Sequence, residues 1–100
     1  MAGALFVLTL LGFEIVVYAS IISRIISDIE EQVTNYYSWT IGVTDDPDRR
    51  RREHENPRVW YHWDATSETA ARYIETYFLD KGIKGNTGGA KGANYVYIFL

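Results

Sequence analysis

The chain contains no cysteine and only two histidines. Without cysteine, neither a disulfide framework nor a thiolate metal site can form. Imidazole is available from two positions only, His54 and His62. Two imidazoles without a thiolate argue against a closed zinc site. The stability of the fold must therefore come from a hydrophobic core.

The length and composition are those of one small folded domain. A chain of 100 residues is large enough to fold around a single core. Hydrophobic residues make up 47% of the chain and aromatic residues 15%, which excludes a disordered chain. No internal repeat is visible, so a repeat architecture is not expected.

An excess of basic charge is also lacking, because the formal net charge is −3. This value argues against a generic nucleic-acid binder. The charge is unevenly distributed, however: residues 1–38 contain one arginine and four acidic residues, whereas residues 39–100 contain nine of each sign. Basic residues cluster at Arg49–Arg52, followed by Arg58, and again at Lys81, Lys84 and Lys91. These two basic segments are compatible with a local phosphate contact.

The first 22 residues are almost entirely apolar, with Glu14 as the one strongly polar side chain between Ala2 and Ile22. About 20 apolar residues in a helix span a bilayer. No basic residue precedes this run, so it lacks the charged start of a secretory signal. A carboxylate in mid-span is costly in lipid and needs a partner. If the segment does span, Arg24 and the later arginines predict a membrane-anchored domain that faces the cytoplasm; otherwise a cytoplasmic protein is expected.

The same segment contains a second pattern, a heptad repeat of apolar residues within residues 5–33. Its members are Leu5, Leu8, Gly12, Ile15, Ala19, Ile22, Ile26, Ile29 and Val33. This pattern predicts a helix buried in a homo-oligomer or against the rest of the domain. A third alternative is a β-hairpin with strands at residues 5–10 and 13–18. The membrane helix, the packed helix and the hairpin all remain open at this point.

Residues 35–100 show alternating strand and helix patterns. We expect strands at 36–43, 59–63 and 95–100, a helix at 48–55 capped by Asp45 or Asp46, and a helix up to residue 81 capped by Asp64 or Thr66. Residues 81–94 are predicted to be a glycine- and lysine-rich loop. This loop follows a helix and precedes a strand, whereas a phosphate-binding Walker loop follows a strand and precedes a helix. The predicted fold class is α+β: a small three-stranded antiparallel or mixed sheet flanked by helices, preceded by a long hydrophobic helix at 1–34.

Several short motifs in this part follow a known order. Thr40-Ile41-Gly42 is followed by Arg50 eight positions after the glycine and by His54 four positions later. A strand and a helix with Ala71-Arg72-Tyr73-Ile74-Glu75 come next. This set resembles the GIY-YIG nuclease superfamily over about half of the chain. The resemblance implies nucleic-acid processing or binding, with DNA or RNA as the partner.

The resemblance also implies roles for individual residues. Arg50 would contact the phosphate, because a guanidinium fork stabilises the charge that develops there. Glu75 would hold Mg²⁺ or Mn²⁺, since carboxylate oxygens are suitable ligands for hard cations. His54 would serve as a base or orient a water molecule. We therefore expect Arg50, His54 and Glu75 to converge on one concave surface.

One family residue is missing, because Thr40 stands where the second motif has a tyrosine. The strand at 95–100 would fill the place of the first motif strand in a permuted arrangement, and Tyr95 or Tyr97 would then supply the hydroxyl. We assign Tyr97 to the catalytic set. The alternatives are structural: Arg50 pairs with Glu75, Glu75 pairs only with Arg72, or His54 packs on Trp60 or Trp63. The domain would then be a catalytically inactive interaction module that its N-terminal helix oligomerises or anchors.

Overall fold

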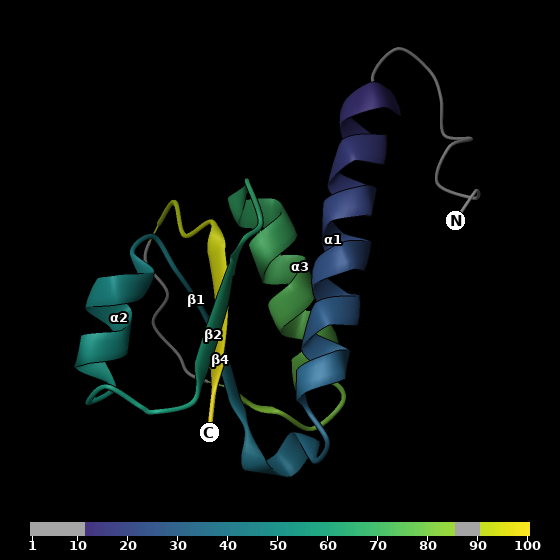
Figure 1. Ribbon diagram of the computed structural model, residues 1–100. Coiled ribbons are helices and arrows are strands. Elements are labelled where there is room, and N and C mark those ends of the chain that lie inside the picture. The colour runs from purple at the N-terminus through teal and green to yellow at the C-terminus, as the bar shows by residue number, and fades with distance from the viewer. Residues whose placement is uncertain (1–11, 86–90) are drawn as a thin grey trace.

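A computed structural model describes residues 12–85 and 91–100 of the chain. The structure is α+β, with one sheet between helices (Figure 1). Helices α1 and α3 lie on one side of the sheet and α2 lies on the other. The elements are α1 (Gly12–Gln32), η2 (Tyr36–Ser38), β1 (Thr40–Thr44), α2 (Pro47–Glu53), β2 (Trp60–Asp64), α3 (Glu68–Leu79), β3 (Lys84–Gly85) and β4 (Tyr95–Phe99).

The sheet is mixed, with the strand order β2-β4-β1-β3. Strand β4 is central and pairs antiparallel with both β1 and β2. The short strand β3 pairs with β1 in parallel. The register places Gly42 of β1 and His62 of β2 opposite Tyr97 of β4. Three segments that are distant in sequence therefore meet in the middle of the sheet.

Alternation along β4 separates the two faces of the sheet, because successive side chains of a strand point to opposite faces. Val96 and Ile98 belong to the main hydrophobic core, whereas Tyr97, which is also buried, does not. We call the face of Val96 and Ile98 the core face. The face of Tyr95, Tyr97 and Phe99 is called the α2 face, because α2 lies on that side.

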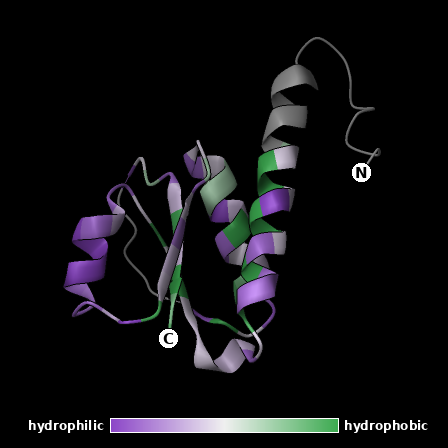
Figure 2. Cartoon of the chain, viewed as in Figure 1, coloured by the Kyte–Doolittle hydropathy of each residue, from purple (hydrophilic) through white to green (hydrophobic). Residues whose placement is uncertain are grey.

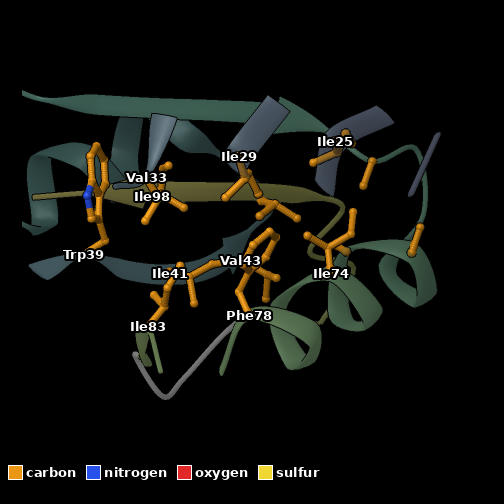
Figure 3. Close-up of a cluster of buried hydrophobic side chains, with 14 of the residues drawn as sticks. Ile25, Ile29, Val33, Trp39, Ile41, Val43, Ile74, Phe78, Ile83 and Ile98 are labelled. Atoms are coloured by element: carbon orange, nitrogen blue, oxygen red, sulfur yellow. The ribbon is translucent and has the colours of Figure 1, made fainter. Parts of the chain in front are cut away.

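The core fills the space between the core face and helices α1 and α3. Figure 3 shows that side chains from both helices and from β1 and β4 point toward one another there. Apolar residues recur along one side of α3, so that Ala70, Ala71, Ile74 and Phe78 are buried together. In contrast, α2 is hydrophilic over its length (Figure 2) and contains no buried residue.

Helix α1 contributes to this core. Ile25, Ile29 and Val33 are buried against α3 and the sheet, with exposed fractions of 0%, 0% and 7%. Ile29 and Val33, the C-terminal members of the predicted heptad, thus pack within their own domain, whereas the fully buried Ile25 was not among its members. Helix α1 and residues 35–100 share one core. Because α1 begins at Gly12, the predicted strand at 13–18 is wrong. Residues 1–11 of the predicted helix lie outside the described residues.

A membrane-spanning helix was one of the open alternatives. Within residues 12–85 and 91–100, none of the helices combines the length and the apolar character that crossing a bilayer requires.

Other local predictions need correction. Among the described residues the sheet has four strands and not three, because Lys84 and Gly85, predicted to be in a loop, pair with Thr40 and Ile41. Residues 36–38 form a 3-10 turn before the strand begins, with the Asn35 side chain accepting from the Tyr37 N–H at 3.0 Å. The cap of α3 is Ser67, whose hydroxyl accepts from the Ala70 N–H at 3.1 Å. Asp64, Thr66 and Ser67 are all residue types that cap helices, so residue type alone did not distinguish between them.

The role of α1 in the core leads to a stability prediction. Ile29→Ala should lower the free energy of unfolding by about 2–5 kcal/mol, because it removes fully buried methylene groups and leaves a cavity. Glu31→Ala, on the exposed side of the same helix, should change it by less than about 0.5 kcal/mol. Urea unfolding followed by circular dichroism measures both values. Equal effects of the two variants would mean that α1 is not part of the domain core.

Candidate functional site

The site begins with helix α2, whose start is determined by its sequence. The Asp46 side chain accepts a hydrogen bond from the Arg49 N–H at 3.1 Å, and Pro47 occupies the first turn. Both features are typical of a helix N-terminus. The helix ends after two turns at His54. Because Arg50 and His54 are four residues apart, they lie on the same side of the helix.

That side of α2 meets Tyr97, which projects from the centre of the sheet. Arg50 Nε donates a hydrogen bond to the Tyr97 hydroxyl at 3.2 Å. His54 Nε2 lies 3.0 Å from the same hydroxyl. The His54 and Tyr97 rings also contact each other, with centroids 5.5 Å apart. The structure thus brings together three of the four predicted site residues, Arg50, His54 and Tyr97.

Gly42 provides the space in which Tyr97 lies. A Cβ atom at position 42 would lie 2.5 Å from Cζ of Tyr97 and still closer to its hydroxyl oxygen. No side chain fits at such a distance, so the tyrosine ring needs a glycine beneath it. Since Gly42 is directly opposite Tyr97 in the β1–β4 register, the strand pairing and the site depend on each other.

The surroundings of His54 favour the neutral form of its imidazole. Burial lowers the pKa of His54, and the positive charge of Arg50 lowers it further. A neutral imidazole can accept a hydrogen bond at Nε2 when its proton is on Nδ1. Arg50 Nε–H donates to the Tyr97 oxygen, and with this tautomer the Tyr97 O–H can donate to His54 Nε2. The three groups form one chain of hydrogen bonds from a cation to a neutral base.

The guanidinium of Arg50 also has an acidic partner. Arg50 Nη1 donates to Glu53 at 2.8 Å, and Arg49 contacts the same carboxylate at 3.3 Å. The hydrogen bond from Arg50 holds the pKa of Glu53 below its ordinary value, and the bonds to Glu53 and Tyr97 raise the pKa of Arg50. The side chain of Arg50 remains about one-fifth exposed (21%). Its cation is therefore oriented by the protein and still reachable from solvent.

Aromatic side chains surround Tyr97 on the α2 face. Trp60 stacks on Tyr97 with centroids 4.6 Å apart and an interplanar angle of 9°. Phe99 contacts His54 at 4.6 Å between centroids. The proposed contact between His54 and Trp60 is present at 6.4 Å. Sequence reasoning did not place Trp60 in the site, although its alternation with His62 along one strand was a signal that the two share a face.

Glu75, the fourth predicted site residue, lies elsewhere. It belongs to α3, which packs on the core face, whereas Arg50, His54 and Tyr97 lie on the α2 face (Figure 1). Its carboxylate contacts Arg72 at 3.5 Å, as one structural alternative proposed, whereas the proposed pair of Arg50 with Glu75 does not form. Burial raises the pKa of Glu75, against the opposing effect of Arg72. The expected convergence of all four residues on one surface is therefore wrong for Glu75.

Comparison of the chain with models of known protein families, with curated proteins and with solved structures found no match.

The close approach of Tyr97 to Gly42 can be tested by substitution. Gly42→Ala should lower the free energy of unfolding by about 1–3 kcal/mol, because the added methyl group forces the tyrosine ring to move. In a Tyr97→Leu background the same substitution should cost less, because the clashing ring is absent. Denaturant unfolding of the four proteins in this double-mutant cycle measures the difference. Additive effects would contradict the packing described here.

The lowered pKa of His54 predicts a dependence of stability on pH. Unfolding returns His54 to its ordinary value of about 6.5, so below that pH the unfolded chain binds more protons than the folded chain. The contribution of His54 is thus fully present above pH 6.5 and is lost as the pH falls through the folded value. The melting temperature should fall between pH 7.5 and 5.5, and less so in His54→Gln. Identical pH profiles of the two proteins would contradict the neutral imidazole.

Proposed function

We propose that the domain binds nucleic acid on the α2 face, with Arg50 contacting a backbone phosphate. The observation that supports this proposal most is the convergence of Arg50 and His54 on Tyr97 beside Gly42. These are the positions at which the sequence resembles GIY-YIG nucleases, and in the permuted arrangement proposed from the sequence β4 would supply the tyrosine. A resemblance spread over short motifs gains weight when its residues meet in space.

The chemistry of Arg50 suits a phosphate ligand. A guanidinium has five N–H donors in a fixed fork that matches phosphate oxygens. The bonds to Tyr97 and Glu53 orient this fork before a ligand arrives. Further positive charge lies along the same helix and just after it, at Arg51, Arg52 and Arg58. An oriented arginine within a local basic cluster is typical of a phosphate-contacting surface.

Tyr97 and His54 have supporting roles in this proposal. Tyr97 is 1% exposed, so its hydroxyl positions Arg50 and His54 and does not itself meet the phosphate. His54 is partly exposed and neutral, and it therefore adds a hydrogen-bonding group beside the cation without adding charge. The site thus has one charged contact and one neutral partner, both attached to the sheet through a single hydroxyl.

The divalent cation that the resemblance implies does not fit this arrangement. Its expected ligand, Glu75, is on the opposite face of the sheet and is paired with Arg72. In the described part of the chain, no group of three or more acidic or histidine side chains has the geometry of a metal site. No step through Mg²⁺ or Mn²⁺ is therefore assigned to this domain. Binding without metal-assisted cleavage corresponds to the interaction module considered from the sequence.

The binding proposal predicts distinct effects of two substitutions. Arg50→Ala should weaken the binding of a fluorescein-labelled oligonucleotide by about 10- to 150-fold, the loss of one hydrogen-bonded charge contact. It should also reduce the salt slope of log K by about 1. Glu75→Gln is the matched control, since it changes a carboxylate across the sheet, and should bind as the parent does. Fluorescence anisotropy over a salt series measures both quantities.

Two outcomes would contradict the proposal. Equal binding by Arg50→Ala and the parent would remove Arg50 from the interface. A loss of binding in Glu75→Gln, but not in Arg50→Ala, would move the site to the other face of the sheet. Circular dichroism of each variant establishes that the protein remains folded.

A further inference from the structure

The α2 face has an aromatic surface next to Arg50 that the contact with a phosphate does not use. We call it the aromatic stripe; it consists of Trp60 and His62 of β2 and Tyr95 and Phe99 of β4. The strand register places all four side chains on the same face of the sheet. His62 is exposed, and the other three are partly exposed. Partly exposed rings on two neighbouring strands offer a surface on which a flat ligand such as a nucleic-acid base can stack.

The stripe is held in a fixed orientation. The Trp60 ring stacks on the buried ring of Tyr97, and its indole N–H donates to His62 Nδ1 at 2.9 Å. His62 in turn contacts the Tyr95 ring edge-on, with centroids 6.2 Å apart. Rings that are already immobilised lose little conformational entropy when a flat ligand stacks on them. At the far end, Asp64 adds a negative charge beside Tyr95, which limits the stripe on that side.

The spacing of the rings distinguishes between classes of nucleic acid. The centroids of Trp60 and His62 are 6.5 Å apart, and those of His62 and Tyr95 are 6.2 Å apart. Stacked bases in one strand of a duplex are about 3.4 Å apart. Bases that meet successive rings of the stripe must therefore be unstacked from each other. Bases in a duplex also cannot reach the rings without being flipped out.

The stripe and the phosphate contact are adjacent. Trp60 and Arg50 both contact Tyr97, one through its ring and the other through its hydroxyl. A flat aromatic group and a cation that share one tyrosine are placed to meet the base and the phosphate of neighbouring nucleotides. From this geometry we infer that the domain binds single-stranded nucleic acid, with bases stacked on Trp60 and His62 and the backbone at Arg50. This inference rests on the proposed function and adds its substrate class.

The experiment compares a labelled 12-nucleotide oligothymidylate with a labelled hairpin duplex that has the same number of phosphates. The parent should bind the single strand more tightly than the duplex in fluorescence anisotropy at fixed salt. Trp60→Leu should weaken binding of the single strand by about 5- to 150-fold, the loss of one base-stacking contact. Trp60→Phe, which keeps a ring, should restore most of the affinity. Tyr61→Leu, on the same strand but the opposite face, should bind as the parent does.

Trp60 also packs on Tyr97, so its replacement can disturb the fold, and His62→Ala provides a second test because His62 is exposed. This variant should keep the melting temperature of the parent and bind the single strand more weakly. The inference is overturned if the duplex binds as tightly as the single strand, or if folded Trp60→Leu and His62→Ala both bind as the parent does. In either case the proposed function stands as long as Arg50→Ala weakens binding as predicted. If neither oligonucleotide binds the parent, both proposals are wrong.

Discussion

The packing of Tyr97 over Gly42 is the contact on which the candidate site depends. Helix α2 contains no buried residue, so it has no apolar face that could fix it to the sheet. It is held there by the hydrogen bonds of Arg50 and His54 to the Tyr97 hydroxyl and by the contact of His54 with Phe99. The Tyr97 hydroxyl reaches these residues because the absence of a side chain at position 42 lets its ring lie across β1. The absence of a side chain at Gly42 thus allows the contacts that hold α2 on the sheet.

This dependence explains which parts of the site could be predicted from the sequence. Gly42, Arg50 and His54 are close together in the sequence, because a capped two-turn helix follows directly after the strand. Periodicity and cap residues were enough to place them on one side of α2. The tyrosine could be narrowed only to Tyr95 or Tyr97, because both lie on the same face of β4. The choice is made by the β1–β4 register, which pairs Gly42 with Tyr97 and Thr44 with Tyr95.

The prediction for Glu75 failed for a different reason. Its spacing from Ala71 and Phe78 indicated correctly that it borders the buried side of α3. Helical periodicity does not determine which face of the sheet that side covers. The connection through the sheet, with β4 between β2 and β1, places α3 on the core face with α1. A carboxylate can therefore fit a motif by its spacing along the chain while a layer of strands separates it from the other motif residues.

The central position of β4 also affects when the domain can fold during its synthesis. Strands β1 and β2 are not neighbours; each forms its hydrogen bonds to β4, which comes after both of them in the chain. Until the ribosome has released residues 95–99, the nascent chain has neither the middle of its sheet nor the tyrosine that holds α2. Until then α2 lacks its attachment to the sheet, and the apolar side of α1 lacks part of the core that covers it. Apolar segments that are exposed at this stage are the kind of surface that chaperones protect from aggregation.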